Sequence, residues 1–291
     1  MFPRIVSATL LVFLASVASA QEAVQPEATS AVVEDRRSVT AEDYMVASAN
    51  SIATQFGVEV LQRGGTAADA AVAVQFALNL VEPQSSGIGG GAFLIYWDAR
   101  SGTLTTYDGR EMAPAAATPE YWFGGDGEPV SWFDAVVGGR SVGVPGTLKL
   151  LETVHQRYGN QHWSALIEPT RALAEGGFQV SPRLSNAIAA AAGDRKLDLF
   201  LNSRVYFFDQ DGHALKAGTI LRNPEFADTL DKIQRYGARV FYEGTLAHDI
   251  VSAVRTNVNG GIMTLGDLRD YRVIERAPVC IEYRSFEVCG M

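Results

Sequence analysis

Residues 67–81 form a stretch that is apolar almost all the way round the helix that its sequence predicts. Thr66 is expected to cap the start of this helix, with Asp69 three residues on to complete a capping box. Pro83 prevents the helix from continuing. Because a helix without a polar face must be buried on every side, the chain is expected to fold in layers with this helix between them.

A helix is predicted before this buried stretch and a hairpin after it. Apolar residues at helical spacing predict a helix over residues 50–61, which Gly64 and Gly65 would end. Aromatic and β-branched residues on either side of a glycine-containing loop predict a hairpin of strands 92–97 and 103–108. Helices followed by a hairpin indicate helices packed over a sheet, in an α/β or α+β arrangement.

From Thr147 onward the pattern is mainly helical, and no internal repeat or low-complexity linker follows Asp43. One compact domain is therefore favoured. Residues 205–215 are expected to form a small surface hairpin that turns at residues 209–212. Helices are also expected at residues 147–158, 164–175 and 245–257. Another is expected to be capped by Ser181, with Pro182 at its first position, and one to begin at Asn223-Pro224 and run towards Tyr236. A short helix is expected to be capped by Thr264 with Asp267.

The first 20 residues predict an export signal. Arg4 supplies a positive start, residues 5–17 are apolar, and Ala18-Ser-Ala20 fits a cleavage site for small residues. A membrane anchor is disfavoured because the apolar stretch is shorter than the roughly 20 residues that a span needs. Residues 21–43 are expected to be a poorly ordered mature N-terminus. We therefore expect a periplasmic or secreted protein with no membrane attachment after the signal is removed.

The overall charge excludes one class of partner. Formal net charge is −9 and the isoelectric point is near 5.0. A nucleic-acid-binding domain would need a basic patch, so no nucleic acid is expected as a partner. An acidic average still permits a local basic pocket for an acidic substrate.

Cys280 and Cys289 are the two cysteines of the chain. An exported chain can keep a disulfide, and two strands turning near Arg284 could bring the pair together. Two part-buried thiols are nearly as compatible with the sequence, because it does not supply the Cα separation that a disulfide requires. The pairing therefore stays open at this stage.

The glycine-rich run Gly87-Ile-Gly89-Gly-Gly-Ala92 fits a loose spelling of the dinucleotide-binding fingerprint. That fingerprint requires a strand before the glycines and a helix after them, so that the helix N-terminus meets the pyrophosphate. Here the predicted helix comes first and the strand second. No lysine follows the glycines, which excludes a phosphate-binding P-loop. The run is therefore interpreted as a tight turn that lets a strand approach neighbouring backbone closely.

Arg110 is the candidate substrate-binding residue. It lies in the loop directly after predicted strand 103–108, where a rigid scaffold positions loop residues. A guanidinium offers a planar fork that binds a carboxylate through two hydrogen bonds and stays charged at any working pH. Asp108 and Glu111 beside it could orient it. Most loop arginines are solvated or form weak surface ion pairs, so the choice of Arg110 depends on the surrounding motif.

No pattern in the chain predicts a catalytic residue, a metal site or a cofactor. None of the histidines has the spacing of a metal ligand to another histidine, cysteine or carboxylate. The sequence has no G-x-S-x-G elbow, Ser85 and Ser86 lack a partner base, and no two carboxylates stand out as an acid and base. The histidines are His155, His162, His213 and His248.

From about Asp43 to its last residue, the chain resembles the N-terminal, large-subunit part of γ-glutamyltranspeptidases, also called glutathione hydrolases. Several separate motifs in the family's order make this resemblance specific. The matching stretches are residues 45–48, 57–74, 81–93, 108–114, 142–147, 177–181 and 242–245.

This resemblance implies an α+β fold, the αββα sandwich of N-terminal-nucleophile hydrolases, which is made by self-cleavage of a precursor into a large and a small subunit. Family members transfer the γ-glutamyl group of glutathione or a related amide to water or to an amino-acid or dipeptide acceptor. A threonine at the new N-terminus of the small subunit attacks the γ-carbonyl. Arg110 matches the family arginine that binds the α-carboxylate of the γ-glutamyl group.

Two departures from the family pattern leave alternatives open. Arg110 follows Asp-Gly, where many members have Asp-Phe, and this variant also occurs among relatives that include cephalosporin acylases. A glutaryl acylase-like amidase is therefore an alternative. The chain also ends at Met291, before the family's proline- and serine-rich stretch and its nucleophilic threonine. We expect an incomplete sandwich that is inactive alone, and a truncated, non-catalytic homologue kept as a binding or structural protein is the third alternative.

Overall fold

The structure is a computed structural model that describes residues 38–193, 197–256 and 258–291. The compact unit that holds them is Arg37–Met291. The predicted export signal and the expected tail up to residue 37 lie outside the described residues. Residues 38–43 are exposed and belong to no helix or strand. Within the described part of the chain, no helix combines the length and the apolar character needed to cross a membrane.

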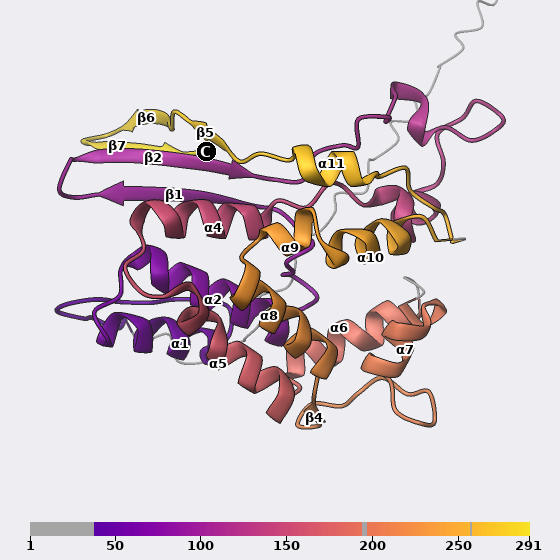
Figure 1. Cartoon of the computed structure of the whole chain (residues 1–291), viewed down its shortest axis with the longest axis horizontal. Coiled ribbons are helices and arrows are strands. Elements are labelled where there is room, and N and C mark those ends of the chain that lie inside the picture. Colours follow the sequence, from indigo (N-terminus) through magenta and orange to yellow (C-terminus); the bar gives the residue numbers. More distant parts are fainter. Residues whose placement is uncertain (1–37, 194–196, 257) are drawn as a thin grey trace, which may run out of the picture. The chain divides into compact units, whose positions relative to one another are not determined.

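Helices α1 (Ser51–Gln62) and α2 (Ala67–Val81) pack against each other (Figure 1). Asn50 caps α1, since its side chain accepts a hydrogen bond from the backbone N–H of Ile52. The capping box predicted for α2 is present. The N–H of Asp69 donates to Thr66 Oγ1 at 3.1 Å, and the N–H of Thr66 donates to Asp69 Oδ2 at 2.9 Å.

Helix α2 is buried, as its apolar surface predicts. Helices α4 (Thr147–Tyr158) and α5 (Trp163–Gly176) pack on it from this same chain. Phe76 of α2 is fully buried and meets Trp163 edge to face, with ring centroids 5.7 Å apart. Asp69 is also fully buried and accepts a hydrogen bond from the N–H of Asn160 at 3.0 Å, which ties the start of α2 to the turn after α4.

The sheet has three antiparallel strands in the order β1 (Ala92–Asp98), β2 (Thr103–Gly109) and β5 (Ile274–Arg276). The first two form the predicted hairpin, in register from Ala92 opposite Gly109 to Asp98 opposite Thr103. Figure 1 shows α4 lying along one face of this hairpin. Leu94 and Tyr96 join the apolar cluster on that face.

The opposite face of β1 is uncovered by the described residues. Phe93, Ile95 and Trp97 alternate with the side chains that face α4, and their exposed fractions are 54%, 46% and 59%. Because side chains of a strand point alternately to its two faces, these three residues form one apolar surface. The sheet is therefore packed on one side only within the described part of the chain.

The remaining helices continue the helical layer, with α8 (Pro224–Tyr236) packed along α5. Ser181 and Asn223 cap their helices as predicted, accepting backbone N–H groups at 3.0 and 2.9 Å, and Thr264 with Asp267 forms the predicted capping box. The other elements are α3 (Trp132–Val136), α6 (Pro182–Gly193), α7 (Leu201–Phe207), α9 (Arg239–Tyr242), α10 (Thr245–Val254), α11 (Leu265–Asp270), three short 3-10 helices (Pro119–Trp122, Gly139–Ser141, Leu197–Leu199), and the paired strands β3 (Phe178–Gln179) and β4 (Ile220–Leu221).

Two predicted elements are wrong in part. Residues 205–207 are helical and belong to α7, because Tyr206 and Phe207 pack against the second apolar cluster of the helical layer and this packing overrides their strand propensity. The predicted turn remains, closed by the N–H of Asp209 donating to the carbonyl of His213 at 2.9 Å.

Helix α10 ends at Val254, three positions before its predicted end at residue 257. The N–H of Gly261 donates to the carbonyl of Val254 at 2.7 Å. The backbone of Gly139 packs so closely there that an added Cβ would lie 1.6 Å from the same oxygen. This tertiary contact ends the helix early.

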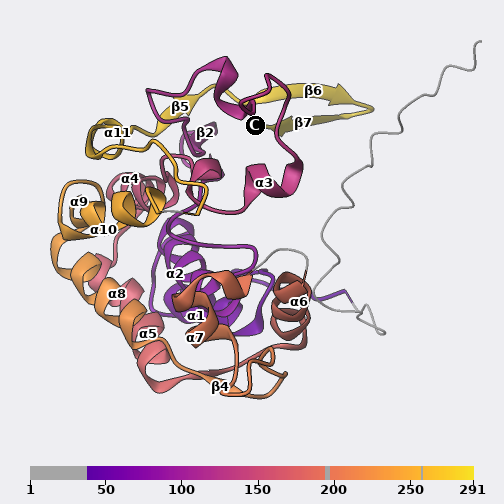
Figure 2. The same ribbon diagram turned by 90° about the vertical axis from the view of Figure 1, so that its right-hand side faces the viewer.

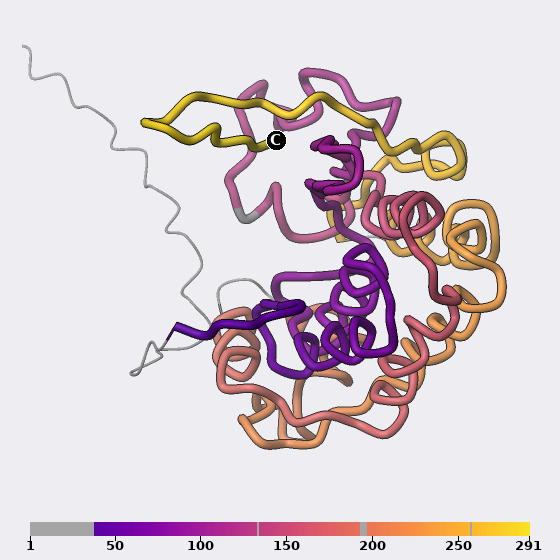
Figure 3. Tube along the Cα trace, turned by 90° about the vertical axis from the view of Figure 1, so that its left-hand side faces the viewer, coloured from indigo at the N-terminus to yellow at the C-terminus, as the bar shows by residue number. Residues whose placement is uncertain are grey.

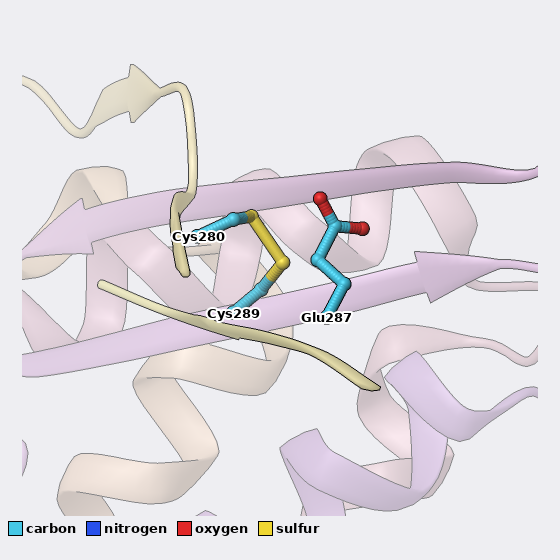
Figure 4. Close-up of side chains that lie close together, drawn as sticks. All are labelled: Cys280, Glu287 and Cys289. Carbon is cyan, nitrogen blue, oxygen red and sulfur yellow. A yellow bond between two sulfur atoms is a disulfide. The ribbon is translucent and has the colours of Figure 1, made fainter. Parts of the chain in front are cut away.

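Strands β6 (Val279–Tyr283) and β7 (Phe286–Gly290) form a hairpin whose turn contains Arg284 in the left-handed region. Cys280 lies opposite Cys289, and a disulfide joins them, which settles the pairing that the sequence left open. Figures 2 and 3 show the hairpin projecting away from the helices. Glu287 lies beside the disulfide (Figure 4). The apolar side chains, all 49% to 68% exposed, are Val279, Ile281, Tyr283, Phe286 and Val288.

Candidate functional site

The glycine run before β1 brings two backbones together, as predicted. The carbonyl of Gly90 accepts hydrogen bonds from the N–H groups of Gly146 and Thr147, at 2.9 and 3.0 Å, where α4 begins. A Cβ added to Gly91 would lie 2.6 Å from the nitrogen of Glu111 and 2.8 Å from Cα of Arg110. Only glycine permits this approach, so the run positions the loop that carries Arg110.

Polar side chains of α2 hold the start of the glycine run. The amide nitrogen of Gln75 donates to Asn79 Oδ1 at 2.8 Å and to Ser86 Oγ at 2.6 Å, and Ser86 Oγ donates to Asn79 Oδ1 at 2.8 Å. Ser86 is therefore part of a structural network. The sequence interpretation missed Gln75 and Asn79, although two polar residues four apart in an otherwise apolar helix were a usable signal.

Glu82 anchors the other side of this turn. Its carboxylate is almost completely buried, and it accepts hydrogen bonds from Asn50 Nδ2 at 2.8 Å and Gln84 Nε2 at 2.5 Å. Arg183 of α6 pairs with the same carboxylate at 3.2 Å. A buried carboxylate is tolerated when it is paired in this way. Glu82 thus joins α1, α2 and α6 directly beneath the glycine run.

Asp108, which was expected to help orient Arg110, contacts the backbone of that residue. The N–H of Arg110 donates to Asp108 Oδ1 at 3.0 Å, and Arg276 Nε donates to Asp108 Oδ2 at 2.9 Å. The backbone N–H of Arg110, and then the Arg276 guanidinium, hold the pKa of the Asp108 carboxyl below its usual range. The carboxylate is thus charged and engaged at neutral pH.

The guanidinium of Arg110 contacts neighbouring side chains and remains partly exposed. Its Nη2 lies 3.3 Å from Glu111 Oε2, so Glu111 contacts it as expected. Its Cζ lies 5.8 Å from the centroid of the Phe93 ring. The Arg110 side chain is 55% exposed, which leaves room for a second anion to bind. Arg110 therefore stands beside the uncovered apolar face of β1, with a cationic fork available to a carboxylate.

Two of the four histidines, His155 and His213, contact residues of neighbouring turns. His155 Nε2 lies 2.9 Å from the carbonyl oxygen of Gln161 and 3.7 Å from Asp69 Oδ1. His213 lies near Asp209 and Asp211 at an exposed turn. Asp209 Oδ1 accepts the backbone N–H of His213 at 2.8 Å and that of Asp211 at 3.0 Å. These contacts stabilise turns.

The second cluster of metal-ligand types contains Cys280, Glu287 and Cys289, whose ligand atoms lie within 4.8 Å of one another (Figure 4). The two sulfurs are joined in a disulfide. Zinc and other soft metals are bound by thiolates, which a disulfide does not provide. The described geometry of these residues is that of a stapled hairpin.

An apolar cavity of about 400 Å³ lies between the extended residues 45–47, helix α2 and the first residues of β1. Leu150 and Leu151 of α4 complete its lining. Strand β1 is an edge strand of the described sheet, since it pairs with β2 alone. An uncovered face, an edge strand and an apolar cavity thus meet at β1, next to the loop of Arg110.

Comparison with known proteins identifies a family whose members are similar to this chain. A family model described as Gamma-glutamyltranspeptidase matches residues 53–291. The glutathione hydrolase proenzyme of Bacillus subtilis (strain 168) is 38% identical over 246 residues, which are 84% of this chain and 41% of that protein. The crystal structure of Helicobacter pylori gamma-glutamyltranspeptidase superimposes with a TM-score of 0.82 at 33% identity, covering 88% of this chain and 71% of that one. A cephalosporin acylase from Bacillus halodurans gives a TM-score of 0.69 at 30% identity, covering 82% and 44%.

The matched region includes the glycine run, the hairpin and the loop of Arg110. The structural likenesses confirm the α+β fold of an N-terminal-nucleophile hydrolase that the motifs implied, and the described sheet and helices are one part of that sandwich. The chain spans about two fifths of the length of the curated relatives that it matches, 41% for the Bacillus protein. On the family match and on these relatives, the chain belongs to the gamma-glutamyltranspeptidase family.

Proposed function

We propose that this chain is the large-subunit part of a γ-glutamyltransferase (glutathione hydrolase), in which Arg110 binds the α-carboxylate of the γ-glutamyl group. The observation that carries the proposal is the placement of Arg110. Its backbone is fixed by Asp108 and by the glycine run, while its guanidinium is 55% exposed beside the uncovered face of β1. Family membership supports the same role.

In the proposed reaction, a threonine hydroxyl from the small subunit attacks the γ-carbonyl, and its proton passes through the threonine's own α-amine to the leaving amine. The acyl intermediate is then released by water or by an amino-acid or dipeptide acceptor. Arg110 contributes by fixing the donor so that the scissile carbonyl lies near the nucleophile. Its planar fork suits this task because it binds a carboxylate in a fixed orientation.

The unpacked side of the sheet supports the proposal that a further part of the protein completes the site. Phe93, Ile95 and Trp97 present an apolar face, and an apolar cavity of about 400 Å³ lies beside residues 45–47. Exposed apolar surface of this kind marks an interaction site. On this proposal the small subunit from the same precursor covers the face and brings the nucleophile to Arg110. The chain alone is then inactive.

We also propose that the protein is exported and acts in the periplasm or outside the cell. The apolar stretch at residues 5–17 supports an export signal. The Cys280–Cys289 disulfide agrees with this location, because disulfides persist in oxidising compartments and are rare in the cytosol.

A glutaryl acylase is the second candidate, supported by the likeness to the cephalosporin acylase from Bacillus halodurans, with a TM-score of 0.69 at 30% identity. Gly109 precedes Arg110, and a Cβ at Gly109 would lie 2.7 Å from Cβ of Leu150. The site is therefore packed around a glycine where many family members have phenylalanine. A glutaryl group shares the chain length, the amide and the terminal carboxylate of a γ-glutamyl group, and it lacks only the α-amino group.

Hydrolysis of two anilides by the full-length protein tests the proposal. We expect release of p-nitroaniline from γ-glutamyl-p-nitroanilide, slower release from glutaryl-p-nitroanilide, and none from residues 21–291 alone. The preference between the two substrates separates the transferase from the acylase. Failure of the processed full-length protein to cleave either substrate would overturn the proposal in favour of a non-catalytic homologue, and cleavage by residues 21–291 would disprove the need for a second subunit.

A further inference from the structure

Residues 264–276, which we call the clamp segment, contact the loop of Arg110 at three points. Asp267 Oδ1 accepts the N–H of Ala115 at 2.8 Å, and Arg276 Nε donates to Asp108 Oδ2 at 2.9 Å. Between them, the hydroxyl of Tyr271 donates to the carbonyl oxygen of Arg110 at 2.8 Å. These contacts join parts of the chain far apart in sequence, so the loop conformation depends on the tertiary fold.

We propose that Tyr271 is a positioning residue for Arg110, because its hydroxyl fixes the backbone from which the carboxylate-binding guanidinium projects. The inference rests on the proposed function of Arg110 and adds a residue that does not touch the substrate. Arg276 also supports the backbone of Arg110, because it binds Asp108, which accepts the N–H of Arg110. The Arg276 side chain is 52% exposed, so its contact is the more exposed one.

Tyr271 is itself held firmly. Its side chain is buried, and its ring stacks on that of Tyr242 with centroids 6.0 Å apart and planes 16° apart. The hydroxyl of Tyr242 donates to the carbonyl of Pro145 at 3.0 Å. A Cβ added to Gly146 would lie 2.1 Å from the Tyr271 oxygen. The hydroxyl of Tyr271 thus lies between Gly146 and the Arg110 carbonyl that accepts its hydrogen bond.

The Arg110 side chain depends on this backbone support. Its guanidinium contacts Glu111 at 3.3 Å and is otherwise largely exposed, so few side-chain contacts define its position. A shift of this backbone would therefore move the guanidinium away from the donor carboxylate and weaken substrate binding. Burial, and then the charges of Asp108 and Glu111, raise the pKa of Tyr271 to about 12, so its hydroxyl remains a donor at any working pH.

The test is Tyr271→Phe in the full-length, processed protein, assayed with γ-glutamyl-p-nitroanilide. The substitution keeps the ring and its stacking on Tyr242 and deletes one hydroxyl. We expect KM to rise about 10-fold with kcat nearly unchanged, which is the upper end of what one hydrogen bond contributes. With 4-aminobutanoyl-p-nitroanilide, which lacks the α-carboxylate, the same substitution is expected to change kcat/KM less than about two-fold, because Arg110 has no carboxylate to bind.

Tyr158→Phe is the matched control. It removes the hydrogen bond between the hydroxyls of Tyr158 and Tyr107, 2.8 Å apart, and Tyr158 makes no hydrogen bond to residues 108–115 among those described. We expect its kinetic constants to match those of the unmodified protein. Arg276→Gln is the second variant, and its expected rise in KM is about three-fold, because an exposed charged pair contributes little.

Combining Tyr271→Phe with Arg110→Ala decides the mechanism. If Tyr271 acts through Arg110, the tyrosine substitution has no further effect in the Arg110→Ala background. Equal losses in both backgrounds, or equal losses with both anilides, would show a general structural role and overturn the inference. A normal KM for both Tyr271→Phe and Arg276→Gln would also overturn it. If Arg110→Ala leaves the kinetic constants unchanged, the proposed function is contradicted instead. Failure of the proposed function and failure of the role of Tyr271 are therefore distinguishable.

Discussion

Helix α2 and strand β1 are separated only by residues 82–91, which include the glycines of the glycine run, yet their apolar surfaces have opposite surroundings. Helix α2 is enclosed by α1, α4 and α5 from this chain. Strand β1 is comparably apolar, but Phe93, Ile95 and Trp97 on one of its faces are about half exposed. The contrast teaches that this chain completes the packing of its helical layer and leaves one face of its sheet for another part of the fold. Arg110 stands at the boundary between these two regions.

The β6–β7 hairpin extends the comparison. Like the open face of β1, it carries large apolar side chains that the described residues do not cover. Unlike β1, it has no helix packed along it within the described part of the chain, and the Cys280–Cys289 disulfide joins its two strands. An isolated two-stranded hairpin is marginally stable at best. The disulfide therefore stabilises this hairpin, whereas packing of apolar side chains stabilises the helical layer.

The largest expected effect comes from deleting a buried ring in the helical layer. Phe76→Ala should lower the free energy of unfolding by about 3–5 kcal/mol, since it removes a fully buried ring that packs on Trp163. Urea unfolding of this chain measures it. Trp97→Ala on the open face is the matched control, and its expected change is within about 0.5 kcal/mol. Equal losses for the two variants would contradict the proposed difference between the regions.

Removing the disulfide should have the next largest effect, confined to the hairpin. Closing a loop of this length stabilises a chain by about 2–3 kcal/mol in the loop-entropy model. Replacing both cysteines, Cys280→Ser with Cys289→Ser, is therefore expected to abolish hydrogen-exchange protection in residues 279–290. Protection in α2 should stay unchanged. A global loss of protection would show that the hairpin supports the helical layer after all.

The smallest expected effect concerns an exposed charge pair on the helical layer. The Arg171 guanidinium, followed by the Gln234 amide, lowers the pKa of Glu168 to about 2. This carboxylate therefore contributes stability at a pH above its ordinary pKa of 4.5, and the contribution is lost as the pH falls towards 2. Glu168 is 49% exposed, so solvent screening limits the effect to less than about 0.5 kcal/mol. Urea unfolding of Glu168→Gln and the unmodified chain at pH 7 and pH 3 checks it, and the two should differ less at pH 3.

Local signals predicted the helical layer well. The capping boxes at Thr66 and Thr264 depend on residues three apart, and the burial of α2 follows from its own composition. The structure of residues 205–207 was not predictable in this way, because their helix depends on packing against distant residues. The disulfide was left open for a similar reason, since strand register decides which cysteines face each other.

At the candidate site, too, features set by local sequence were predicted, and features set by distant residues were not. The motif around Arg110 identified the residue, and the glycine run predicted the close backbone approach that the structure has. The support from Tyr271 was not predictable, because it comes from a segment more than 150 positions away in the chain. Asp108 was expected to help orient Arg110, and its oxygens accept hydrogen bonds from the backbone of Arg110 and the side chain of Arg276. Proximity in sequence does not determine which atoms a carboxylate binds.

The most direct test of the central claim is the kinetic effect of Arg110→Ala in the full-length, processed protein, with Arg110→Lys as its companion. A guanidinium that binds the donor carboxylate predicts a fall in kcat/KM of about 100-fold or more for γ-glutamyl-p-nitroanilide, mostly through KM, with partial recovery in Arg110→Lys. It also predicts little change for the anilide that lacks the carboxylate. Unchanged kinetic constants in Arg110→Ala would contradict the claim.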